Sequence, residues 1–182
     1  FEGESVEQMV KEVIMIPGSG EFVYDTTVQH KVAGEQAGLV WAASGEREYI
    51  NMQNHRGIAN VHASLDSMVE TLPNTEWVGL VVTWFGNSLD AGTCVIKPGV
   101  EFTTGAITEP ETWTVGSYIR STAHPITIDD GRPRYGGAPD DQSILRLLDE
   151  LNSRGYNVMF YPMFFMDVDG KPWRGQVTGS AL

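Results

Sequence analysis

The clearest pattern of apolar and polar positions runs from residue 139 to residue 167, where a helical spacing gives way to an unbroken apolar run. Apolar residues recurring every three or four positions predict a helix with one apolar face, made by Ile144, Leu147, Leu148 and Leu151. Val158–Met166 is then almost continuously apolar, which fits a parallel strand buried on both faces. Asp167 follows directly, at the strand end where α/β folds bind ligands.

The same order of helix and then strand is predicted twice earlier in the chain. Ser5–Ile14 and Asn60–Leu72 have helical apolar spacing, and they precede the expected strands Glu21–Val28 and Trp77–Phe85. Residues 29–59 are polar without a firm period and predict a long loop, with a short strand over Leu39–Ala43. Residues 86–138 show no strong helix, but their aromatic side chains favour an ordered excursion with short strands.

Three helix–strand steps predict an α/β fold of parallel βα units, with the long excursion between the second strand and the third helix. A closed barrel needs about eight strands. The units therefore form either a small open layer or part of a TIM barrel. The 182 residues predict a single domain spanning residues 1–182, and the start at Phe1 rather than at methionine favours a fragment of a longer polypeptide.

Composition narrows the possible partners. The net charge is −12, and no basic stripe is present, which argues against nucleic acid as a ligand. Cys94 is the only cysteine, so neither an intrachain disulfide nor a Cys-rich zinc site is expected, and the scattered histidines predict no metal site. No cofactor motif, signal peptide or apolar run of membrane-spanning length is found.

The candidate catalytic groups are carboxylates, and the reaction they suggest is glycoside hydrolysis, because a glycosidase needs two carboxylates across one sugar site. Asp25 and Asp167 stand at predicted strand ends, and the excursion carries a further acidic set, Asp90, Glu101, Asp129 and Asp130. Aspartates also cap loops and form turns, which is the alternative for each of them. Aromatic residues that could stack on sugar rings, or form part of the core, are Trp84, Trp113, Tyr135 and Trp173.

Five segments in order along the chain resemble one family: Ile16–Thr26, Val81–Glu101, Asp130–Ile144, Phe160–Asp167 and Pro172–Gly175. They are similar to the TIM-barrel-like domain of large tail-tip proteins of gene transfer agents and siphophage-like tails, called the baseplate megatron or host-specificity protein. The family has two cysteines after its Trp-Phe-Gly motif, whereas this chain has Ala91 and Cys94. The family's barrel continues beyond the Pro-Trp-Arg-Gly segment, so this chain would hold the N-terminal part.

The resemblance implies a structural, host-facing module of a phage-like tail tip with a glycoside-hydrolase-like barrel. Expected partners are other tail-tip or baseplate proteins and cell-envelope polysaccharide, and the expected location is the virion tail or phage-like particle, with the bacterial cytoplasm during assembly. The alternatives are an active glycan hydrolase using paired carboxylates and a carbohydrate-binding barrel without catalysis.

If the barrel hydrolyses glycans, the expected catalytic residues are Asp167, fixed by a rigid strand, and Glu101, on a loop that the Lys97-Pro98-Gly99 turn could fold over the barrel mouth. Trp84, Asp25 and Trp173 are the expected ligand-binding residues.

Overall fold

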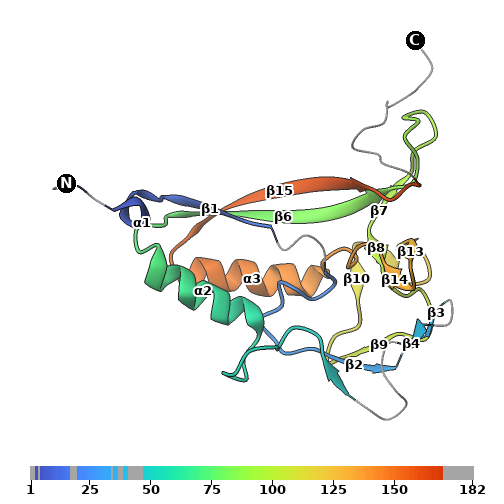
Figure 1. The fold of residues 1–182 in the computed structure, drawn as a ribbon, viewed down its shortest axis with the longest axis horizontal. Coiled ribbons are helices and arrows are strands. Elements are labelled where there is room, and N and C mark those ends of the chain that lie inside the picture. The colour runs from blue at the N-terminus through green and yellow to red at the C-terminus, as the bar shows by residue number, and fades with distance from the viewer. Residues whose placement is uncertain are drawn as a thin grey trace.

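A four-stranded sheet, in which the three main strands are parallel, forms one side of the molecule. The computed structural model describes residues 3, 5–16, 20–33, 35–36, 39–40 and 47–169. Strands β1 (Glu12–Met15), β6 (Trp77–Gly86) and β15 (Asn157–Met166) run parallel in the order β1-β6-β15, and β7 (Ile96–Lys97) pairs antiparallel with the end of β6 (Figure 1). Trp77 pairs with Glu12 on one side and Asn157 on the other, so all three strands start level.

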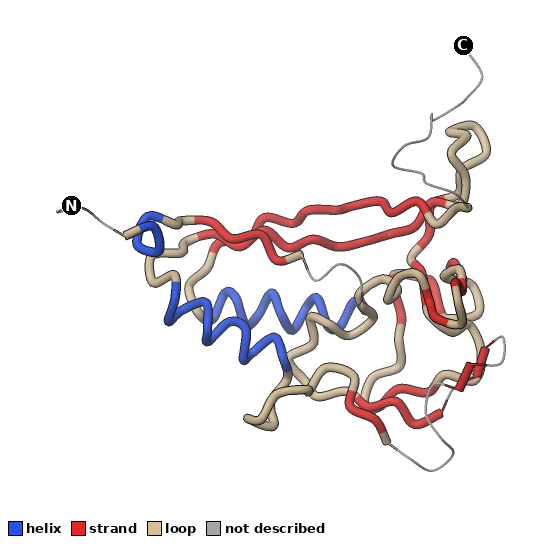
Figure 2. Tube along the Cα trace, viewed as in Figure 1, coloured by secondary structure: helices blue, strands red, loops and turns tan. Residues whose placement is uncertain are grey.

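Helices α2 (Asn60–Thr71) and α3 (Asp141–Ser153) lie together on one side of this sheet (Figure 2). The carboxylate of Asp140 caps α3 by accepting from the N–H groups of Gln142 and Ser143. A core between the helices and the sheet contains Leu65 of α2 and Leu147 and Leu151 of α3, packed with Val78, Leu80 and Val82 of β6. Helix α1 (Val6–Met9) is a short turn before β1.

Small sheets lie near the C-terminal ends of β6 and β15, on the same side of the main sheet as the helices (Figure 1). Strands β2 (His30–Ala33), β5 (Glu48–Tyr49) and β9 (Ile107–Glu109) form one antiparallel sheet. The other pairs are β3 (Glu35–Gln36) with β4 (Leu39–Val40), β8 (Gly99–Val100) with β12 (His124–Pro125), β10 (Thr114–Val115) with β11 (Tyr118–Ile119), and β13 (Ile128–Asp129) with β14 (Arg132–Pro133). A second core, around the fully buried Trp113, packs Val100 of β8 and Val115 of β10 against Phe85 of β6.

The predicted α/β fold of βα units, and the TIM barrel with it, is wrong. Among the described residues the small sheets carry most of the strands, nearly all their pairings are antiparallel, and no barrel closes. The first expected helix–strand step does not exist, because the helix ends at Met9 and the last three residues of Ser5–Ile14 belong to strand β1. Residues 21–24, expected to begin a strand, form a turn whose Tyr24 hydroxyl donates to the carbonyls of Met15 and Val81.

Three local predictions are confirmed. The expected strands Trp77–Phe85 and Val158–Met166 form as β6 and β15, and they are parallel to each other. The apolar face of α3 packs on the sheet. The excursion is ordered, with short strands from β7 to β14.

The expected burial of β15 on both faces is wrong. Phe160 is 54% exposed and Phe164 57% exposed, because α3 covers only part of this strand's helix-side face. Among the described residues no helix is long and apolar enough to cross a membrane.

Candidate functional site

A cavity of about 260 Å³ contains one of the two expected catalytic residues. Its walls come from the turn at residues 20–24, strand β2, the residues before α2 and the loop after β8. The lining residues are Gly20, Glu21, Phe22, Val23, Lys31, Ile50, Asn51, Asn60 and Glu101. The side chains of Asn51 and Asn60 already bond to neighbouring loops, which leaves the charged groups as the reactive part of the wall.

Glu21 is locked in a buried ion pair at one end of this cavity. Its Oε1 accepts from Nη1 of Arg120 at 2.9 Å and its Oε2 accepts from Nη2 at 2.7 Å, the two-pronged geometry that guanidinium and carboxylate groups favour. Oε1 also accepts from the backbone N–H of Glu101 at 3.0 Å. Both oxygens of Glu21 are therefore occupied.

Glu101 behaves differently from Glu21. Burial, followed by the nearby charge of Glu21, raises the pKa of the Glu101 carboxyl from 4.5 to about 7. At neutral pH the group is close to half protonated, which is the property that a general acid or base requires. The described residues supply no second available carboxylate in the cavity, because the contacts of Glu21 are complete.

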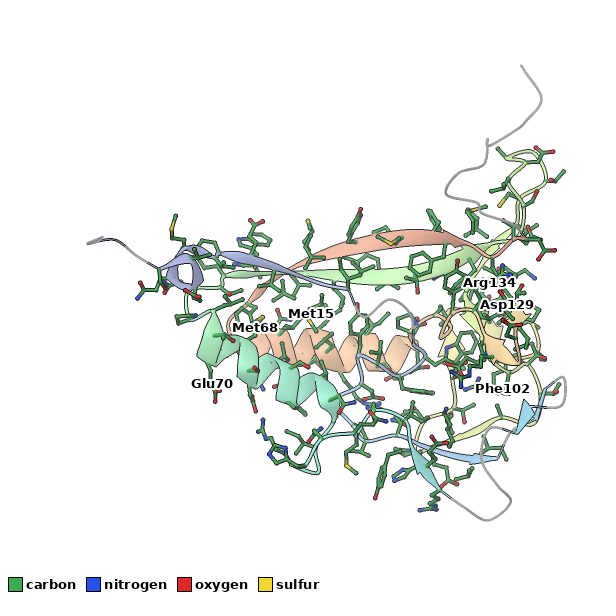
Figure 3. All side chains as sticks on the ribbon, viewed as in Figure 1. Met15, Met68, Glu70, Phe102, Asp129 and Arg134 are labelled. Carbon is green, nitrogen blue, oxygen red and sulfur yellow. The ribbon has the colours of Figure 1, made fainter. Side chains whose placement is uncertain are left out.

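Asp167 lies at the C-terminal end of β15, as predicted, but it does not line this cavity. Its buried Oδ2 accepts from Nε2 of His124 at 2.8 Å and from the backbone N–H of Thr127 at 2.8 Å, and its Oδ1 faces Nη1 of Arg134 at 3.5 Å. Arg134 lies beside Asp129 at this end of the sheet (Figure 3). These contacts tie the excursion to β15, and they do not bring Asp167 and Glu101 into one site.

Asp25 is fully buried and joins its own segment, residues 25–29, to helix α3. Its carboxylate accepts from Nη1 of Arg146 at 2.9 Å, from Nε2 of Gln29 at 2.8 Å and from the backbone N–H of Thr27 at 2.8 Å. These donors give Asp25 a structural role in the described fold, and its expected role as a ligand-binding residue stays a prediction.

Trp84 lines an apolar groove on the helix side of the sheet. Two adjoining hollows of about 470 and 410 Å³ share Val82, Trp84 and Phe160, and they extend from Phe164 of β15 to Leu145 of α3. Phe160 and Phe164 point to the helix side because they pair in parallel register with Leu80 and Trp84. Trp84 is thus placed to contact a ligand or partner, whereas Trp173 lies outside the described residues.

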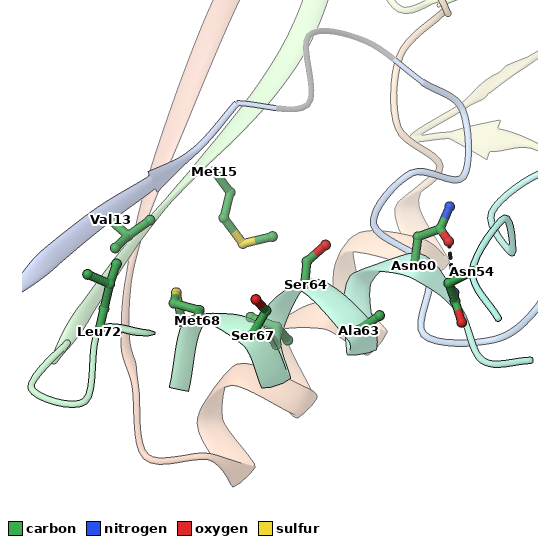
Figure 4. A pocket seen from close by; sticks show the side chains of 10 residues that line it. Val13, Met15, Asn54, Asn60, Ala63, Ser64, Ser67, Met68 and Leu72 are labelled. Atoms are coloured by element: carbon green, nitrogen blue, oxygen red, sulfur yellow. Dashed lines mark hydrogen bonds between the residues drawn. The ribbon is translucent and has the colours of Figure 1, made fainter. Parts of the chain in front are cut away.

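A further hollow of about 630 Å³ lies between β1 and α2 (Figure 4). Met15, Met68 and Leu72 give it an apolar wall, and Asn54 donates to Asn60 at one end. The described residues that line it include no ionisable side chain, so they offer no chemistry comparable to the Glu101 cavity.

The charged partners at these sites could not be found from sequence. Glu21 and Arg120 are 99 positions apart, and His124 and Arg134 reach Asp167 from 43 and 33 positions away. None of these separations leaves a local pattern. Comparison with models of known protein families finds no match, and comparison with curated protein sequences finds no relative.

Proposed function

We propose that this chain is a structural module of a larger assembly and that it docks a partner segment in the apolar groove beside Trp84. The observation that carries the proposal is the exposure of Phe160 and Phe164 on the helix side of β15, where a finished layer would be covered. Contiguous apolar surface of this kind marks interaction sites in folded proteins.

The chemistry of the groove indicates what the partner segment presents. Among the described residues, its lining combines aromatic and aliphatic side chains with one charged residue, Asp141. The chain as a whole carries a net charge of −12. The complementary occupant is an amphipathic segment of another subunit, with large apolar side chains for the groove and basic residues at its margin.

The resemblance to tail-tip proteins of gene transfer agents and siphophage-like tails supports a setting for this assembly. We propose a phage-like tail tip, with other tail-tip or baseplate proteins as partners, formed in the bacterial cytoplasm and carried on the particle. A barrel is not part of this proposal.

A photo-crosslinking amino acid at position 164, in cells that make the protein naturally, tests the docking. The expected result is one dominant crosslinked product whose second component is another protein of the assembly. The matched control is the same substitution at Ile119, which is 52% exposed on β11 and outside the groove. Equal, diffuse labelling at the two positions would contradict docking.

Glycan binding is the second candidate function, favoured by the aromatic lining formed by Trp84, Phe160 and Phe164. Aromatic faces stack on sugar rings, and the groove is open to solvent. Soluble peptidoglycan fragments should then perturb the indole resonance of Trp84, and Trp84→Ala should abolish binding while α3 and β15 keep their native resonances. No perturbation at millimolar fragment would exclude this function.

A further inference from the structure

The outer edge of β15 is open, and its backbone groups alternate along that edge. Among the described residues β15 pairs only with β6, in continuous register over Asn157–Met166. The N–H groups of Asn157 and Asp167, at the two ends of the strand, both donate toward β6 at 2.9 Å. Because successive residues of a strand turn their backbone groups to opposite edges, the odd-numbered residues of β15 face β6 and the even-numbered residues face the open edge.

A proline stands at the centre of the open edge. The residues that turn their backbone groups outward are Val158, Phe160, Pro162, Phe164 and Met166. Pro162 has no N–H to donate, so a strand added here would lose a hydrogen bond in the middle of its ladder. Proline is tolerated on an edge strand where its missing N–H faces solvent, and Pro162 is exposed. The open edge is therefore poorly suited to pairing with a further strand.

The apolar groove lies on the helix-side face of the same strand. Phe160, Pro162 and Phe164 form its floor, and Leu145 of α3 lines its other end. In the hollow over this floor, the indole N–H of Trp84 is the one strong side-chain hydrogen-bonding group that the described lining residues carry. A segment buried in the groove must therefore satisfy its backbone groups by itself.

We propose that the partner segment docks in the groove as an amphipathic helix alongside α3 and does not add a strand to β15; this inference rests on the docking function proposed above. A helix satisfies its own backbone hydrogen bonds, whereas an extended segment would bury unpaired N–H and C=O groups against the apolar lining. The floor from Phe160 to Phe164 spans about 13 Å. A helix covers this length in about two and a half turns, with apolar residues recurring every three or four positions.

The spacing of crosslinks in cells that make the protein naturally tests the conformation of the docked segment. A photo-crosslinking amino acid is placed at position 160 in one variant and at position 164 in another, and the partner residue captured by each is mapped by mass spectrometry. A docked helix should give captured residues about seven or more positions apart, because a helix rises about 1.5 Å per residue. An added strand should give residues about four apart, because paired strands rise equally.

Helical docking and docking itself fail in different ways in this experiment. Captured residues about four apart on one partner would overturn the helical conformation and leave the groove as the docking site. Diffuse labelling from both positions, equal to that from the same crosslinker at Ile119 outside the groove, would overturn the docking function and this inference with it.

Pro162→Val tests the protection of the open edge in the purified chain. The new N–H completes the outward row, so this variant should self-associate at a concentration about tenfold lower than the wild type, measured by analytical ultracentrifugation. Met163→Val is the matched control, because the N–H of Met163 faces β6 and the change adds no donor to the open edge. It should sediment as the wild type does. Equal association of all three proteins would overturn the exclusion of an added strand by Pro162.

Discussion

Replacing Glu101 by glutamine should make the protein more stable at alkaline pH and leave it nearly unchanged at acidic pH. The pKa of Glu101 is raised from 4.5 to about 7 in the folded chain. Between these two values the folded state binds more protons than the unfolded state, so the free energy of unfolding falls as the pH rises. Below pH 4.5 the carboxyl is neutral in both states and resembles the amide of glutamine.

The size of the effect follows from the shift in pKa. A difference of one pKa unit is worth about 1.36 kcal/mol, so the rise from 4.5 to about 7 corresponds to about 3 kcal/mol. Glu101 is partly exposed, which reduces the penalty through solvent screening. We therefore expect Glu101→Gln to raise the free energy of unfolding by about 1–3 kcal/mol at pH 8, and by less than about 0.5 kcal/mol at pH 4.

Urea unfolding followed by tryptophan fluorescence, at pH 4, 5, 6, 7 and 8, measures this difference. The gap between variant and wild type should open between pH 4.5 and 7 and then stay constant. Glu70→Gln, which removes the same charge from an exposed position on α2, should show no such gap. A Glu101→Gln variant that is less stable than the wild type at pH 8 would refute the reasoning, because it would mean that the ionised carboxylate stabilises the fold.

Four further substitutions test the fold and the assigned roles by urea unfolding at pH 7. Leu147→Ala should lower the free energy of unfolding by about 2–5 kcal/mol, because Leu147 is fully buried in the core. Leu145→Ala, at an exposed position of the same helix, should lower it by less than about 0.5 kcal/mol. Equal losses would mean that the buried face of α3 is misassigned. Asp25→Asn should lower the free energy of unfolding by about 2–4 kcal/mol. This is slightly less than the usual loss on breaking a buried ion pair, because the partner Arg146 is partly exposed. An unchanged stability would favour Asp25 as a ligand-binding residue. Asp167→Asn should cost about 1–3 kcal/mol through weaker bonds to the donors around it, and a neutral result would count against its structural role.

The sequence by itself determined the elements whose apolar pattern matches their period. Asn60–Thr71 and Asp141–Ser153 are helices because an apolar stripe recurs at helical spacing, and the first of them ends just before Pro73. The long strands β6 and β15 follow from two unbroken apolar runs, and their parallel pairing from the helix that connects them. The position of Asp167 at the end of a strand also followed from the local pattern.

Only the tertiary structure decided the conformation of residues 12–15 and 21–24 and the environment of Glu101, because the contacts responsible join residues that are far apart in sequence. Residues 12–15 have helical spacing, yet they form β1 because an edge of β6 is available to pair with them. Residues 21–24 are rich in strand-forming types, yet they turn because Tyr24 bonds two separate carbonyls and Glu21 meets Arg120. The raised pKa of Glu101 depends on burial and on the charge of Glu21, 80 positions away. Local periodicity determines which segments are helical or extended, whereas charge pairing and the available sheet edges determine how they assemble.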